Sequence, residues 1–216
     1  MKSVQAGFAK TSKVVIWAAL ASASLLSQPS MAFFDAQLLV GPRWAEVKGD
    51  NQSDSTRGTD MTAAAHLDPI PLIPVGFGFY YSQLSYDPNQ FSTLGLKSLT
   101  GSEIGLEATA WLPMIPILTP YLKVGLPVYS DFKGSTVSTD PTTGVESDVD
   151  VTFKSSGVRL GVGAKFSLIP LVAILAEAGL GQQKLKLEKS AGVTANPKTE
   201  FDYKSTAFLV GVQVGI

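Results

Sequence analysis

The chain has 216 residues and no cysteine, and its formal net charge is −1, from 17 basic and 18 acidic residues. This composition excludes disulfides and thiolate metal sites, and the slightly negative charge argues against a nucleic acid as partner. The length fits a single domain.

The first element in chain order is a secretory signal peptide over residues 1–32. Lys2, Lys10 and Lys13 form a positive leader, Val14–Leu26 is an apolar run, and Ser30–Ala32 is a small-x-small cleavage site. The apolar run is shorter than the roughly 20 residues that a spanning helix needs. We therefore expect cleavage after Ala32, which leaves one domain over residues 33–216 that is more acidic than the whole chain.

The mature chain alternates between bulky apolar residues and glycine, polar or charged ones, which is typical of strands because successive side chains point to opposite faces. The clearest example is residues 205–216, where Phe208, Val210, Val212 and Val214 share one face. Counting such runs predicts about eight strands: Phe34–Val47, Thr59–Asp68, Val75–Tyr86, Gly101–Leu112, Thr119–Phe132, Val151–Ser167, Leu171–Leu187 and Glu200–Ile216.

Two kinds of connection alternate between these strands. Polar loops are predicted at Gly49–Gly58, Asp87–Leu99, Asp131–Asp150 and Lys189–Thr199, and short apolar corners with proline at Pro69–Pro74, Pro113–Leu118 and Ser167–Leu171. Long loops on one rim and tight turns on the other are typical of outer-membrane barrels. The predicted fold class is therefore all-β, an eight-stranded antiparallel up-and-down transmembrane barrel.

One face of the predicted strands is apolar and uncharged, and we expect it to face lipid. This outward set is Ala36, Leu38, Val40, Met61, Ala63, Ala65, Leu67, Val75, Phe77, Phe79, Tyr81, Ile104, Leu106, Ala108, Ala110, Leu122, Val124, Leu126, Val128, Val158, Leu160, Val162, Ala164, Val172, Ile174, Ala176, Ala178 and Leu180. Interfacial aromatic girdles are predicted at Trp44, Tyr81, Tyr129 and Phe132 on the loop side, and at Phe34, Tyr121 and Phe166 on the turn side.

A soluble sandwich or lipocalin-like barrel also alternates, with its apolar face packed inside. Three features favour the membrane barrel: strands longer than the usual 5 to 6 residues, apolar tight turns, and a polar face rich in glycine, which weakens ordinary strands.

The mature chain resembles the small eight-stranded outer-membrane barrels of the OmpA, OmpX and OmpW kind. Its most specific feature is the C-terminus, where such proteins carry a recognition strand for the barrel-insertion machinery. Gly211, Val214 and Ile216 match that strand, although Ile216 stands where a terminal phenylalanine is usual. The resemblance implies residence in the outer membrane of a Gram-negative bacterium, among lipids and lipopolysaccharide.

An eight-stranded barrel has an interior only wide enough for side chains. On the predicted phase the inward charges nearly balance, and they include Asp35, His66, Asp68 and Lys165. Charges held away from water need partners, so we expect a structural ion-pair network that plugs the lumen. Its predicted members are Arg43, Glu103, Glu107, Lys123, Arg159 and Glu177, of which Glu107, Lys123, Arg159 and Glu177 share one mid-barrel height.

Catalysis, metal binding and cofactors find little support in the sequence. The single histidine, His66, has no serine or carboxylate at a motif spacing, although some small barrels modify lipid A through such a pair. The acidic run Asp140–Asp150 lacks the ligand spacing of a calcium loop. No catalytic, cofactor or metal site is therefore predicted.

Two functions remain open. One is a structural or interaction protein that meets an extracellular ligand through loops 87–99 and 131–150, because loops on rigid scaffolds commonly bind partners. The other is a narrow channel for small, possibly hydrophobic, solutes, as OmpW-like members suggest.

Overall fold

A computed structural model describes residues 34–49, 52–67, 74–87, 96–112, 117–139, 142–169, 171–190 and 200–215. The predicted signal peptide and its cleavage site at Ala32 lie outside this part of the chain. None of the described residues forms a helix long and apolar enough to cross a membrane.

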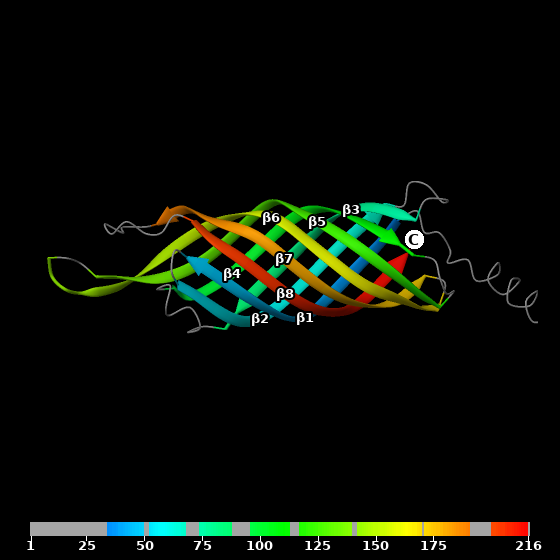
Figure 1. The fold of residues 1–216 in the computed structure, drawn as a ribbon, viewed down its shortest axis with the longest axis horizontal. Coiled ribbons are helices and arrows are strands. Elements are labelled where there is room, and N and C mark those ends of the chain that lie inside the picture. The colour runs from blue at the N-terminus through cyan, green and yellow to red at the C-terminus, as the bar shows by residue number, and fades with distance from the viewer. Residues whose placement is uncertain are drawn as a thin grey trace, which may run out of the picture.

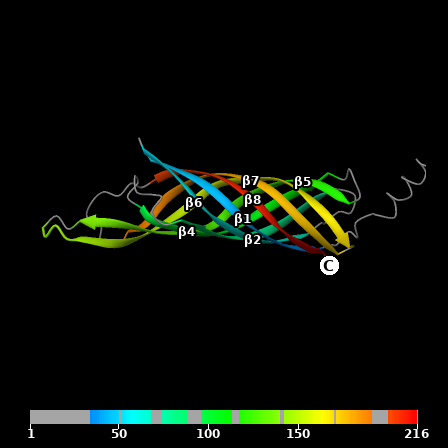
Figure 2. The ribbon, with the colours of Figure 1, turned by 90° about the horizontal axis from the view of Figure 1, so that it is seen from below.

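The described chain forms a closed antiparallel barrel in which each strand pairs with its neighbours in sequence and β1 pairs with β8 (Figure 1, Figure 2). This confirms the predicted number, order and direction of the strands. Their bounds are β1 Phe34–Gly49, β2 Gln52–Leu67, β3 Val75–Tyr86, β4 Leu96–Trp111, β5 Leu118–Thr139, β6 Glu146–Ile169, β7 Val172–Ser190 and β8 Glu200–Gly215.

The predicted polar loops are too long. Strand β2 begins inside the loop predicted at Gly49–Gly58, β4 begins inside Asp87–Leu99, and β5 and β6 continue into Asp131–Asp150. Their serine, threonine and aspartate content resembles that of a loop, but the residues pair across strands, as Ser135 does with Asp150. As a result, β5 and β6 form a long hairpin that projects beyond the rest of the barrel (Figure 1).

The predicted outward face is confirmed: every residue of that set is exposed or half-buried on the barrel wall. Among the large side chains of the set, Val128 is the most exposed, at 72%, and Phe79 reaches 65%. Inward neighbours such as Leu39 and Tyr80 are buried. The apolar side of the strands therefore lies outside, as a membrane barrel requires and a soluble barrel does not.

The strands reverse this pattern toward the loop rim. On β8, Val210 and Phe208 face outward, but farther along the same face come Lys204 and Asp202, while Tyr203 turns inward. The inward residues of this outer part form an apolar core of Ala45, Val47, Leu84, Tyr86, Leu96, Leu99, Phe132, Val151, Phe153, Leu185, Phe201 and Tyr203. We call it the outer core, and the expectation of a polar lumen is wrong at this end of the barrel.

A β-bulge in β5 explains one wrong girdle residue. Ile104 pairs with Tyr129 and Gly105 with Pro127, so Val128 is an extra residue next to a proline that has no N–H to donate. The bulge shifts the phase of β5, and Phe132, predicted to lie in the girdle, is fully buried inside the barrel.

Tyr121 is the second wrong girdle residue. It is buried in the lumen because it is on the same face of β5 as Lys123. The other predicted girdle residues, Trp44, Tyr81, Tyr129, Phe34 and Phe166, are exposed on the outer wall.

Spin labels provide a direct test of this orientation. Labels at Leu106 and Val210 in reconstituted vesicles should be accessible to oxygen and shielded from a water-soluble relaxation agent, because both side chains face outward below the reversal. A label at Lys204, above it, should show the opposite accessibility. Aqueous surroundings at Leu106 and Val210 would contradict a lipid-facing wall.

Candidate functional site

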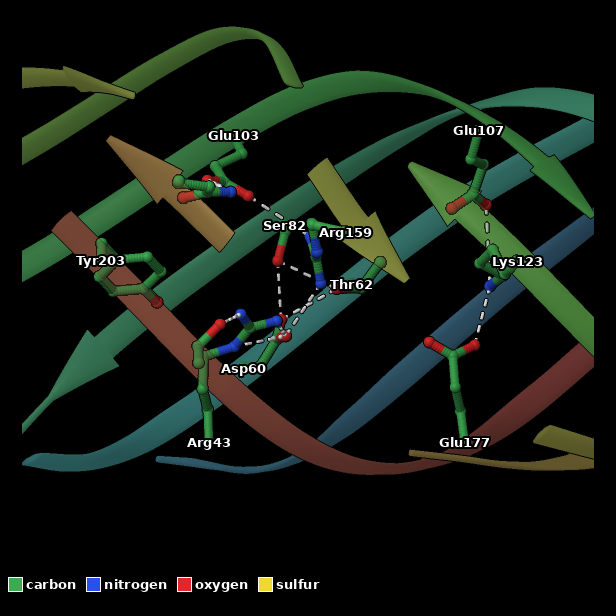
Figure 3. A network of polar contacts seen from close by, with 12 residues as sticks. Arg43, Asp60, Thr62, Ser82, Glu103, Glu107, Lys123, Arg159, Glu177 and Tyr203 are labelled. Carbon is green, nitrogen blue, oxygen red and sulfur yellow. Dashed lines mark hydrogen bonds and ion pairs between the residues drawn. The ribbon is translucent and has the colours of Figure 1, made fainter. Parts of the chain in front are cut away.

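Asp60 on β2 is the centre of a buried cluster in the lumen (Figure 3). Its Oδ2 accepts hydrogen bonds from Arg43 Nε at 3.0 Å and Arg159 Nη2 at 3.2 Å, and Arg43 Nη2 makes a further contact with the same atom. Its Oδ1 accepts from Ser82 Oγ at 2.7 Å and Thr62 Oγ1 at 2.9 Å. One carboxylate therefore satisfies two guanidinium groups drawn from β1 and β6.

Glu103 on β4 extends this cluster to side chains of β6 and β7. Its carboxylate accepts from Gln183 Nε2 at 2.8 Å, Ser155 Oγ at 3.3 Å and Arg159 Nη1 at 3.5 Å. The Arg159 guanidinium also lies 5.0 Å from the centre of the Tyr80 ring, within range of a cation–π interaction. We call Arg43, Asp60, Glu103 and Arg159 the central cluster.

A second cluster lies nearer the turn rim. His66 contacts Asp35 Oδ1 through Nδ1 at 2.9 Å and Glu107 Oε1 through Nε2 at 2.5 Å. Lys123 Nζ lies 3.0 Å from Glu177 Oε2 and 3.8 Å from Glu107 Oε1. Only the doubly protonated imidazole can donate to both carboxylates, so the contacts fit a positively charged His66. These five residues are called the inner cluster.

Neutral side chains complete the inner cluster. Tyr121 Oη donates to Glu177 Oε2 at 3.0 Å, and Lys123 Nζ donates to Gln37 Oε1 at 3.3 Å. Since charges withdrawn from water are stable only when paired and hydrogen-bonded, these contacts make a charged interior compatible with a stable barrel.

Glycines separate the two clusters. Gly125, Gly161 and Gly179, on β5, β6 and β7, line a cavity of about 20 Å³ between Arg159 and Lys123. That volume suits about one water molecule. Arg159 of the central cluster and Lys123 of the inner cluster both line this small space.

The structure separates the predicted network residues into these two groups. Arg43, Glu103 and Arg159 meet in the central cluster, and Glu107, Lys123 and Glu177 meet in the inner one. Arg159, predicted at the same height as Glu107, Lys123 and Glu177, pairs with Asp60 and Glu103 and not with these residues. Gly211 and Val214 lie on β8, and Ile216 and Asp68 lie outside the described residues.

Asp60 is the main residue that the sequence analysis missed. Asp60 and His66 lie on β2 an even number of residues apart, so both face the same side of the strand. That spacing was enough to place Asp60 in the lumen. Within the described part of the chain, no group of three or more His, Cys, Asp or Glu residues is arranged to hold a metal ion.

The fold and the charged lumen define the class of the molecule: a small, closed, eight-stranded transmembrane β-barrel of the outer-membrane type. Among solved structures, the chain is similar to Neisserial surface protein A, with 14% sequence identity and a TM-score of 0.53, over 86% of this chain and 98% of that one.

Two further solved barrels are similar. A major outer membrane protein from Thermus thermophilus shares 15% identity over 84% of this chain and 99% of its own, with a TM-score of 0.48. OprG from Pseudomonas aeruginosa shares 13% identity over 86% and 97%, with a TM-score of 0.46. Neither protein-family models nor curated proteins gave a match. At these identities the likeness concerns the fold.

Proposed function

We propose that this protein resides in the outer membrane of a Gram-negative bacterium as a plugged barrel that presents its outer loops and the β5–β6 hairpin to extracellular partners. The observation that carries the proposal is the filling of the lumen. A solute that entered from the turn rim would meet the inner cluster, then the central cluster, and finally the apolar outer core. No conducting path fits such an interior.

The projecting hairpin is the proposed contact surface. Above the pair Thr136 and Val149 it extends past the strands on either side, and Glu146, Asp148 and Asp150 follow one another on its outward face. Lys97 on β4 contacts Asp148, which ties this face to the barrel. An acidic surface on a rigid support suits a partner with positive charge.

The proposed role is not enzymatic and needs no cofactor. His66 is fully buried, and both its ring nitrogens are engaged by carboxylates. A general base must reach the proton that it abstracts, and a lipid A substrate on the outer wall cannot meet this side chain. His66, Asp35 and Glu107 act instead as part of the plug.

Planar-bilayer recording tests the plug. The purified protein should insert without discrete openings, since both ion clusters and the outer core obstruct the lumen.

A second variant tests the hairpin. Replacing residues 139–146 with Asn-Gly should keep the barrel folded and without discrete openings, because Ser138 and Ser147 already pair across the hairpin and a two-residue turn can join them. Bacteria that carry this variant should adhere less to immobilised matrix proteins than those with the wild type.

Boiling before electrophoresis provides the folding control for both proteins, because a closed barrel migrates differently from the unfolded chain. Ion-selective openings of the wild type would reject the plug in favour of the narrow-channel alternative. Unchanged adherence of a folded variant would exclude residues 139–146, the tip of the hairpin, as the contact surface and leave the plug untouched.

A further inference from the structure

The outer wall has an apolar hollow where β7, β8 and β1 adjoin. It measures about 450 Å³. The β1–β8 ladder pairs Val40 with Val210 and Arg43 with Ala207 but is interrupted at Gly41 and Pro42, since proline cannot donate a ladder hydrogen bond. Small outward residues deepen the hollow between larger ones, and its lining includes Val40, Pro42, Ala176, Ala178, Phe208 and Val210.

The hollow lies in the half of the apolar wall that is closer to the loop rim. Trp44 stands just above it on β1 and packs edge-on against Phe208, with ring centres 5.9 Å apart. Its surroundings are the lipid-facing band, so the medium that fills it is hydrocarbon.

A cation without a carboxylate partner among the described residues lies farther toward the loop rim, beyond Trp44 and Thr206. Lys204 follows Phe208 and Thr206 on the outward face of β8, at the first charged position. Its cross-strand neighbour Glu46 pairs with Lys48 at 3.1 Å. Every other exposed lysine whose side chain is described lies within 4.0 Å of a carboxylate, whereas Lys204 has no such partner among the described residues.

We propose that the hollow and Lys204 form a binding site for lipid A, with one acyl chain along Ala176 and Ala178 and a phosphate group against the Lys204 ammonium. A phosphorylated, acylated lipid satisfies both features at once, because the apolar floor takes its chain and the lone cation takes its anion. The inference rests on the proposed function in one respect: the loop rim must face the outer leaflet, where lipid A resides.

The test uses the full mature protein in phosphatidylcholine nanodiscs that contain bisphosphorylated lipid A, with bound lipid counted by native mass spectrometry. Ala178→Phe should abolish retention, because the ring fills the hollow while remaining compatible with lipid. Lys204→Gln should weaken binding about fivefold, the value of one lysine near a membrane surface.

Matched controls lie elsewhere on the same wall. Ala108→Phe adds the same ring at an outward alanine of β4, and Lys154→Gln removes a lysine that already contacts Glu188 at 3.6 Å. Both controls should retain lipid A as the wild type does.

Equal retention by Ala178→Phe, or none by the wild type, would overturn the site. So would a dimer that Ala178→Phe converts to monomers, which would make the hollow a contact between copies. These failures leave a folded, silent barrel intact. Failure to insert into bilayers would instead reject the proposed function.

Discussion

Asp60→Ala should destabilise the folded barrel by about 3–5 kcal/mol, the cost of removing one partner of a buried ion pair. Asp60 is fully buried and its Oδ2 serves both Arg43 and Arg159. Without it, Arg43 would keep, among the described residues, only the neutral Ser205 Oγ as a partner, at 2.8 Å, and Arg159 would keep Glu103, at 3.5 Å. The loss is therefore greater than that of one hydrogen bond.

Urea titration of the protein in lipid vesicles, followed by tryptophan fluorescence, measures this change. The matched control is Asp202→Asn on β8, an exposed carboxylate outside the lumen, which should change the unfolding free energy by less than about 0.5 kcal/mol. The double variant Asp60→Asn with Arg43→Met should recover part of the loss, because it removes the stranded charge as well. Equal stability of Asp60→Ala and the wild type would refute the central cluster as a stabilising element.

Phe132→Ala should have the second large effect, a loss of about 3–5 kcal/mol from the cavity that it leaves in the outer core. Phe132 is fully buried, its ring lies 5.9 Å from that of Tyr203, and it covers Gly101 on β4, where any Cβ would stand 2.5 Å from the ring. That glycine has no side chain to refill the space.

Hydrogen exchange distinguishes this change from a general one. Amides of β5 and β8 around Phe132 and Tyr203 should exchange faster, while amides near the inner cluster should stay protected, because the central cluster separates the two regions. The control is Val128→Ala in the bulge, whose side chain is 72% exposed and packs little. Uniform exchange along the whole barrel would contradict a separate outer core.

The sequence was sufficient to predict the architecture because alternation is a local property. The apolar face, from Leu38 on β1 to Val210 on β8, follows from side-chain parity alone, and so does the inward position of Arg43, Glu107 and Lys123. Which charges meet was harder to predict, since pairing depends on register and strand tilt. Because of this register and tilt, Arg159 contacts Asp60 and Glu103 and not Glu107 and Glu177, which contact Lys123.

Two other features could not be predicted from local sequence patterns. The bulge at Val128 inserts one residue and so reverses which residues of the rest of β5 face outward. As a result, Phe132 lies inside the barrel and not on its outer wall. The outer core was hidden because its serine- and aspartate-rich strands resemble loops, although Val149 and Val151 alternate within them. A periodicity that changes its apolar face partway along most of the strands was the overlooked signal.

The reversal of the strand pattern means that one continuous sheet is held together by opposite forces at its two ends. In the membrane-embedded part, polar side chains pair inside a barrel that hydrocarbon surrounds. In the outer core, apolar side chains are buried away from water. Cooling weakens the second force and leaves the first largely unaffected. On cooling, the outer core should therefore lose its packing before the membrane-embedded part of the barrel does. The change from apolar to polar outward residues along the strands also sets how deep the barrel lies in the membrane.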